Sequence, residues 1–92
     1  MAGERDGLTY YRIDVDGFEH FEQKVVMRVG RVDGKWVNER FDYRADRWVD
    51  DTAYYAEVFF RGEDRYEEIS RDEANELVRV GRAIARGGSG HE

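Results

Sequence analysis

The sequence predicts a small α+β domain, and three observations support this fold class. Residues 8–43 alternate apolar and polar side chains and are interrupted by Asp-Gly pairs, a pattern typical of antiparallel strands and turns. Residues 71–86 carry an apolar stripe at helical spacing. The 92-residue chain is also below the size at which polypeptides divide into domains. We therefore expect a single domain over residues 8–86, flanked by flexible segments at 1–7 and 87–92.

Three strands are expected to form an antiparallel meander, covering about residues 8–15, 20–31 and 36–43. In the first strand, one face carries Tyr11, Ile13 and Val15. In the second strand, a single parity carries Phe21, Val25, Met27 and Val29. This alternation predicts a sheet with one buried face.

The turn at Asp33-Gly34 allows two registers for the second hairpin. A two-residue turn pairs Val29 with Asn38, whereas a type I turn followed by a left-handed Gly34 pairs Val29 with Val37. A slip of one residue moves every side chain to the opposite face of the strand. The apolar pattern therefore favours the second, bulged register.

The C-terminal helix is the most clearly marked element. Ser70 and Glu73 form a capping-box pattern at its start, and Gly87 marks its end. Its apolar stripe consists of Ala74, Leu77, Val78, Gly81, Ile84 and Ala85. Glycine inside a helix is unfavourable by about 1 kcal/mol relative to alanine. Gly81 therefore predicts a close approach between this helix and the sheet.

Residues 47–62, "RWVDDTAYYAEVFFRG", fit either a helix or a strand. The helical interpretation spans about 51–61, begins at Asp50 or Asp51 and ends at Gly62. Its apolar face would hold Trp48, Val49, Thr52, Tyr55, Ala56, Phe59 and Phe60. We favour this helix, followed by a short extended segment anchored by Tyr66 and Ile69. In the alternative, residues 53–60 and 65–69 form a second hairpin, which gives a five-stranded antiparallel sheet with one C-terminal helix.

The same region resembles a known group of sequences. "DRWVDD", "FFRGED" and "YEEISRDEANEL" are similar to the C-terminal half of short uncharacterised proteins from GC-rich, actinobacterial-type genomes, over residues 46–77. The resemblance implies a short helix after the tryptophan and a last helix that opens at the serine. The activity of that group is unknown, so no catalytic residue is implied.

Composition argues against several functional classes. The net charge of −6 opposes binding to nucleic acid or to an anionic membrane. The absence of cysteine excludes disulfides and thiol chemistry. No apolar run approaches the roughly 20 residues that a bilayer requires, so we expect a cytoplasmic protein.

Catalytic and metal-binding patterns are weak. His20 and His91 are the only histidines, too few for a zinc site or for an activated nucleophile. Asp14, Asp16 and Gly17 resemble part of a calcium loop, but Gln23 stands where that loop needs a glutamate. We therefore expect no catalytic residues, no cofactor and no metal.

The aromatic residues suggest a function. Thirteen of 92 residues are aromatic, more than a three-stranded sheet and one helix need for a core. One buried face also cannot accommodate both Tyr10 and Tyr11. Tyrosine, tryptophan and arginine are enriched at the centres of protein interfaces. We expect a non-enzymatic interaction module or homodimer, whose contact surface includes Tyr10, Arg12, Arg31, Trp36 and Tyr54.

Two alternative functions rest on charge. One stripe of the last helix carries Arg71, Arg79, Arg82 and Arg86, which could bind the anionic group of a small ligand or nucleic acid in a regulator. The excess of acidic residues could instead mimic nucleic acid and bind a basic protein.

Overall fold

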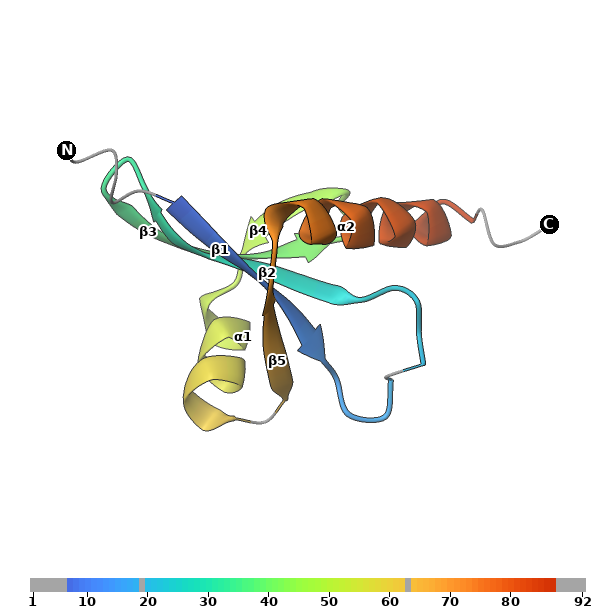
Figure 1. Cartoon of the computed structure of the whole chain (residues 1–92), viewed down its shortest axis with the longest axis horizontal. Coiled ribbons are helices and arrows are strands. Elements are labelled where there is room, and N and C mark those ends of the chain that lie inside the picture. The colour runs from blue at the N-terminus through green and yellow to red at the C-terminus, as the bar shows by residue number, and fades with distance from the viewer. Residues whose placement is uncertain (1–6, 19, 63, 88–92) are drawn as a thin grey trace.

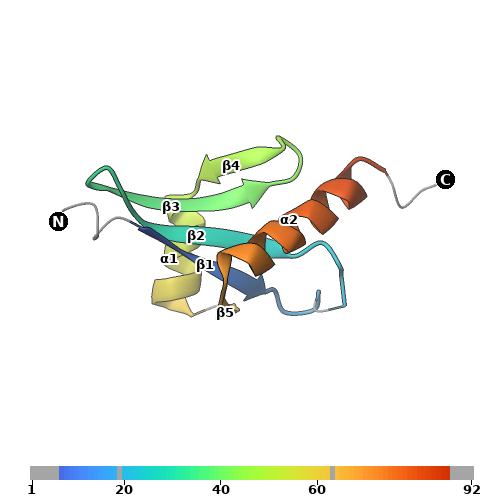
Figure 2. The same cartoon turned by 45° about the horizontal axis from the view of Figure 1, so that its top comes forward.

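The computed structural model describes residues 7–87, apart from residues 19 and 63, as a five-stranded antiparallel sheet with helices on both of its faces (Figure 1). The elements, in chain order, are β1 (Gly7–Asp14), β2 (Val25–Val32), β3 (Lys35–Asp42), β4 (Arg47–Asp50), α1 (Thr52–Ala56), the π-helical turn η2 (Glu57–Arg61), β5 (Arg65–Ile69) and α2 (Arg71–Ala85). The strand order is β4-β3-β2-β1-β5. Helix α2 runs diagonally across one face, as Figure 2 shows, and α1 with η2 covers part of the other.

The predicted α+β class is confirmed, while the three-stranded meander is only partly right. Strands β1, β2 and β3 are neighbours as expected, but β1 ends at Asp14 and β2 begins only at Val25. The sheet has five strands, as in the alternative fold. Its added strands are β4 and β5, whereas residues 52–61 are helical, as the leading interpretation predicted.

Both faces of the sheet are buried in part, which corrects the expectation of a single buried face. On the α2 face, the core consists of Tyr10, Val26, Ile69 and Ala74. On the α1 face, it consists of Ile13, Met27 and Val58. Adjacent residues of one strand therefore reach different cores. Tyr10 packs under α2, and Tyr11 packs against η2.

The observed register is that of the two-residue turn, so the prediction of a bulged turn was wrong. Val29 is paired with Asn38, and both Asp33 and Gly34 have positive φ, at 54° and 78°. Two consecutive positive φ angles are typical of the type I′ turn, whose twist matches that of a hairpin. Burial of the polar Asn38 is tolerated because its carbonyl accepts a hydrogen bond from Asp51 N and its Oδ1 accepts one from Thr52 Oγ1.

Helix α2 has the predicted ends. Ser70 Oγ accepts a hydrogen bond from Glu73 N at 3.0 Å, and Gly87 has a φ of 82° after the last turn. The close approach predicted at Gly81 is made to the ring of Tyr43, directly after β3. Residues 1–6 and 88–92 lie outside the described residues, so the expected flexibility of 1–7 and 87–92 stays a prediction, although Gly7 begins β1.

Candidate protein-interaction surface

Five aromatic side chains form a continuous surface on the α1 side of the sheet. We call this set the aromatic face, and it consists of Trp36, Tyr55, Phe59, Phe60 and Tyr66. Phe60 is 75% exposed, Trp36 57% and Tyr66 47%. Exposed apolar residues are common singly, but a contiguous patch on a small domain requires an explanation.

Ring contacts link the aromatic face from one side to the other. Tyr55 lies at the centre, with ring centroids 6.2 Å from Trp36 and 5.0 Å from Phe59. Phe59 in turn lies 4.3 Å from Tyr66 of β5. Beneath them, Tyr11 contacts Phe59 at 5.0 Å and Tyr66 at 5.6 Å, both edge to face. Because these rings support one another, the surface is held in place by its own contacts.

The helical segment sets which rings point outwards. Asp51 caps it: its Oδ1 accepts a hydrogen bond from Tyr54 N at 3.1 Å, and its Oδ2 accepts one from Arg40 Nε at 2.9 Å. Gly62, with φ of 69°, ends it. Val58 is fully buried against the sheet, whereas Phe60, two residues later, projects into solvent.

The prediction of Phe60 on the buried helical face was therefore wrong. That face included Trp48 and Val49, which belong to β4 and not to the helix. The apolar positions of the true helix are Tyr54, Tyr55, Val58 and Phe59. This spacing places Phe60 outside the buried stripe.

The structure divides the five predicted interface residues between the two faces. Tyr10 is only 8% exposed and belongs to the core under α2. Arg12 lies on that same face, in ion pairs with Asp14 and Glu67. Trp36 belongs to the aromatic face, and Arg31 is its exposed cross-strand neighbour.

Tyr54 is partly buried beside the aromatic face. Its hydroxyl donates to Asp64 Oδ2 at 3.4 Å. Burial, and then the negative charge of Asp64, raise the pKa of Tyr54 to about 12. The Tyr54 hydroxyl therefore keeps its proton to a higher pH than an exposed tyrosine and donates a hydrogen bond to Asp64. Sequence reasoning missed four members of the aromatic face: Tyr55, Phe59, Phe60 and Tyr66. Their signal was the total of thirteen aromatic residues, which is more than one core needs.

Three of the four helix arginines face carboxylates in the structure. Arg79 Nε donates to Glu76 Oε1 at 3.1 Å, which raises the pKa of Arg79 and lowers that of Glu76. Arg82 Nε donates to Asp46 Oδ1 at 2.7 Å, and Arg86 lies 3.8 Å from the same carboxylate. Arg71 is exposed in the first turn of α2. The carboxylates offset much of the positive field that an anion would need.

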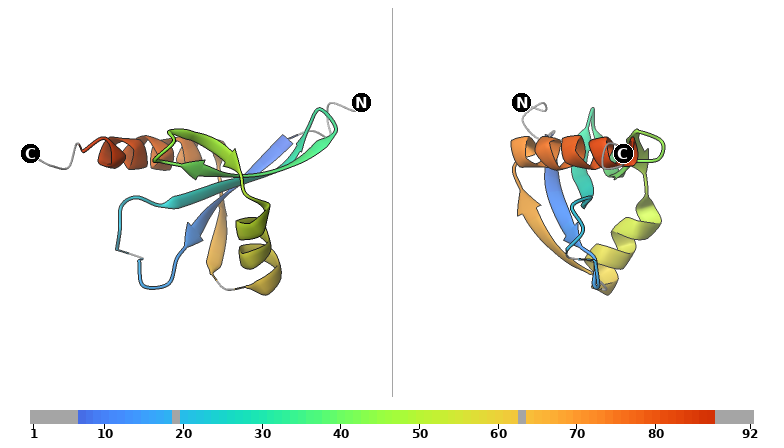
Figure 3. Two further views of the ribbon diagram at one scale, coloured as in Figure 1. Left: turned by 180° about the vertical axis from the view of Figure 1, so that it is seen from behind. Right: turned by 90° about the vertical axis from the view of Figure 1, so that its right-hand side faces the viewer.

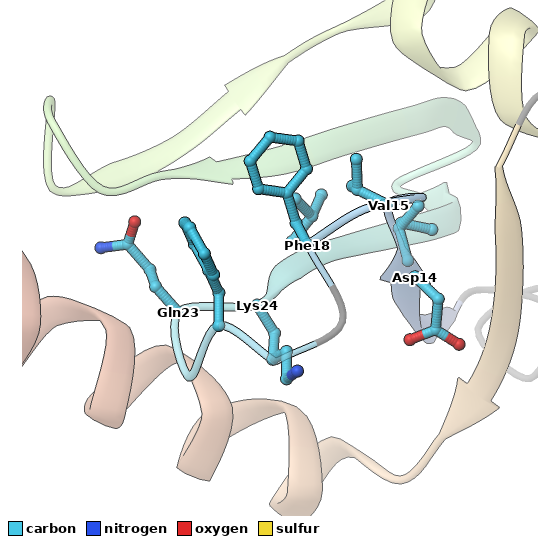
Figure 4. Close-up of a pocket in the computed structure, with 8 residues that line it drawn as sticks. Asp14, Val15, Phe18, Gln23 and Lys24 are labelled. Carbon is cyan, nitrogen blue, oxygen red and sulfur yellow. The ribbon is translucent and has the colours of Figure 1, made fainter.

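A second feature is an apolar cavity of about 250 Å³ under the β1–β2 loop (Figure 4). Its lining includes Ile13, Val15, Phe18, Phe21 and Val25. The loop is fixed to the rest of the fold at one end, where Gln23 Nε2 donates to the Gly81 carbonyl at 3.0 Å and Tyr43 Oη donates to the Lys24 carbonyl at 2.6 Å. Such a cavity could hold a small apolar group, but it is below the usual size of a ligand pocket.

No group of three or more metal-ligating side chains is brought together among residues 7–87, as far as they are described. His20 and Glu22 are exposed on the β1–β2 loop, while Glu19 and His91 lie outside the described residues. In the described part of the chain, neither helix has the length and apolar character of a bilayer-spanning segment.

Comparison with known proteins adds no further assignment. No family model matches the chain, and no match is found among curated proteins or solved structures. The functional argument therefore rests on the chemistry of the described surface.

Proposed function

We propose that the protein is a cytoplasmic, non-enzymatic interaction module that binds a protein partner through the aromatic face. The observation that carries the proposal is the contiguity of Trp36, Phe60 and Tyr66 with the rings between them, at exposures of 47–75%. A monomer gains nothing from leaving such a surface in water. A partner that covers it gains apolar burial.

The expected gain is large enough to matter for binding. An aromatic side chain buries about 150–250 Å² on full burial. At about 25 cal/mol per Å², covering the exposed part of Phe60 alone would contribute about 3 kcal/mol. Tryptophan and tyrosine are also enriched among the residues that dominate binding energy at interfaces. Trp36 and Phe60 are therefore the residues whose removal should weaken binding most.

The charge-based alternatives have less support. A regulator that binds an anion through the arginine stripe would have to separate Arg79 and Arg82 from Glu76 and Asp46. Mimicry of nucleic acid would require an acidic surface, whereas the most distinctive surface of the described residues is apolar.

The test compares two pairs of exposed aromatic residues. Trp36→Ser/Phe60→Ser alters the aromatic face, and Phe18→Ser/Phe21→Ser alters a similarly exposed pair on the β1–β2 loop. Each tagged protein is purified gently from its own cells, and its native mass and bound polypeptides are quantified. We expect the first variant to lose its partner and the second to retain it.

Circular dichroism and thermal melting check that both variants are folded. Retention of the same partner by the Trp36/Phe60 variant would refute the proposal. Equal loss in both variants would also refute it, because the effect would then not be specific to the aromatic face.

A further inference from the structure

Strand β5 forms an open edge of the sheet. Among the described residues, it pairs with β1 on one side and with no strand on the other, and four of its five residues are exposed. Figure 3 (right) shows β5 as the outermost element on its side of the molecule, with α2 starting above it and η2 on the far side of the sheet. The backbone groups on the outer side of an edge strand are a template for another strand.

The side chains of β5 alternate in a self-complementary way. Arg65 and Glu67 lie on the α2 face, because they pair with Asp14 and Arg12 of β1. Tyr66, between them, lies on the α1 face and belongs to the aromatic face. The strand therefore presents a positive and a negative group on either side of an aromatic ring.

Symmetry restricts how two such edges can pair. When a two-fold axis perpendicular to the sheet relates two antiparallel strands, each side chain stays on the same face of the sheet in both copies. Residues directly opposite each other must also point to the same face. The axis must therefore pass between two copies of the same residue. An axis at Arg65, Glu67 or Glu68 would place like charges directly opposite each other, which is unfavourable. An axis at Tyr66 instead places the two Tyr66 residues opposite each other. It also places each Arg65 opposite Glu67 of the second copy.

The neighbouring groups are compatible with this register. Arg12 forms an ion pair with Oε1 of Glu67 and so keeps this side chain at the edge. Arg12 Nε in turn lies 3.0 Å from Asp14 Oδ1. The Tyr66-centred register also places Asp64 opposite Glu68 of the second copy. Asp64, however, accepts a hydrogen bond from Tyr54 and so is directed back towards α1.

We propose that the partner is a second copy of this chain, joined edge to edge through β5 in the Tyr66-centred register, so that Tyr66 is the part of each aromatic face that the second copy contacts. The result is a continuous ten-stranded sheet in which the two aromatic faces meet at Tyr66. The inference rests on the proposed function, because it names the partner that the aromatic face contacts. Charged side chains often prevent edge pairing, but here their alternation selects one register.

The test uses charge reversal. Arg65→Glu creates an edge with two acidic positions, and Glu67→Arg creates one with two basic positions. In a dimer of either variant alone, positions 65 and 67 carry like charges at both contacts between the two copies. In a mixed dimer with one copy of each variant, both contacts join opposite charges. Native mass is measured over a concentration series for the wild type, each variant and the equimolar mixture, with a mass tag on one variant.

We expect the wild type to dimerise and each variant to dissociate with a constant raised about 10- to 100-fold. The mixture should restore a dimer that contains one copy of each. This rescue also shows that both variants fold, although Glu67→Arg removes the ion pair with Arg12. As a matched control, Glu68→Arg changes an acidic side chain of the other face that lies opposite Asp64 of the second copy, so it should leave the dimer intact or make it tighter.

A wild type that stays monomeric at all concentrations would overturn the inference but leave a different protein as partner of the aromatic face. A dimer whose dissociation constant is unchanged by both charge reversals, and which is lost in Trp36→Ser/Phe60→Ser, would also overturn the inference. That outcome would support the proposed function. Variants that are monomeric alone and in mixture would overturn it as well, because the charge pairing would then not set the register.

Discussion

The ring of Tyr43 lies directly against Gly81 of α2. A Cβ added at residue 81 would lie 2.5 Å from Tyr43 Cζ and closer still to Cε1. Tyr43 is in turn held by its hydrogen bond to the Lys24 carbonyl at 2.6 Å. The contact therefore joins the C-terminal half of α2 to the end of β3 and to the β1–β2 loop.

Gly81→Ala should destabilise the protein. In an exposed helix this change stabilises by about 1 kcal/mol. Here the methyl group overlaps the Tyr43 ring, and overpacking typically costs about 1–3 kcal/mol. We expect a net loss of up to about 2 kcal/mol in the free energy of unfolding, measured by urea denaturation. In a Tyr43→Ala background the same change should be neutral or stabilising. Equal effects in both backgrounds would contradict the contact.

Stability should fall at alkaline pH because of two tyrosines. Burial raises the pKa of Tyr43 to about 12, and burial together with Asp64 raises that of Tyr54 to about 12. The folded state therefore binds these protons more tightly than the unfolded state, in which tyrosine has a pKa of about 10. The resulting stabilisation is fully present below pH 10 and is lost as the pH rises from about 10 to about 12.

Ultraviolet titration of the tyrosinate absorbance measures this directly. In the wild type, Tyr43 and Tyr54 should titrate late, near the pH at which the fold is lost, and burial raises the pKa of Tyr11 as well. Tyr43→Phe and Tyr54→Phe should each remove one late group. Six tyrosines that titrate together near pH 10, while circular dichroism shows an intact fold, would contradict the burial.

The β2–β3 turn should be sensitive at one position and tolerant at its neighbour. Gly34→Ala forces a side chain into positive φ, at 78°, and should lower the free energy of unfolding by about 1 kcal/mol. Asp33→Asn keeps a residue that accepts left-handed φ and should be nearly neutral. Urea denaturation of both variants checks this difference. Equal tolerance at both positions would indicate that the hairpin uses another turn.

This turn also shows where sequence reasoning reached its limit. The choice of register depended on matching Val29 with an apolar partner, which is valid for a sheet with one buried face. Helices cover both faces here, so Val37 and Val29 can lie on opposite faces. Asn38 then becomes acceptable beside Val29 because Asp51 and Thr52 satisfy its polar groups. These partners come from a distant part of the sequence, which no local pattern specifies.

Elements with local signals could be predicted well. Ser70, Glu73 and Gly87 mark the ends of α2 through local hydrogen bonds and backbone angles. Gly62 likewise ended the preceding helix where expected. The four-residue strand β4 could not be separated from that helix, because Trp48 fits the apolar stripe of either.

The same limit explains the candidate surface. The excess of aromatic residues pointed to an exposed set, but its members depended on which face each strand buries. Tyr10 was assigned to the surface because Tyr11 already occupied the only expected core. The second core, under α2, buries Tyr10. Trp36 lies on the opposite face of the sheet and is exposed.

Two neighbouring residues of η2 should separate folding from binding. Val58 is 1% exposed and packs with Ile13 and Met27, so Val58→Ala should lower the free energy of unfolding by about 2 kcal/mol. Phe60 is largely exposed, so Phe60→Ser should change stability by less than about 0.5 kcal/mol. Because a dimer makes stability depend on concentration, both variants are compared with the wild type at one low protein concentration.

The two variants should behave in the opposite way towards apolar probes. Phe60→Ser removes the most exposed ring of the aromatic face and should reduce the fluorescence of a bound hydrophobic dye. Val58→Ala leaves that face in place and should retain dye binding below its melting temperature. A large loss of stability in Phe60→Ser would show that this ring is part of the core. The case for a binding surface built on η2 would then fail.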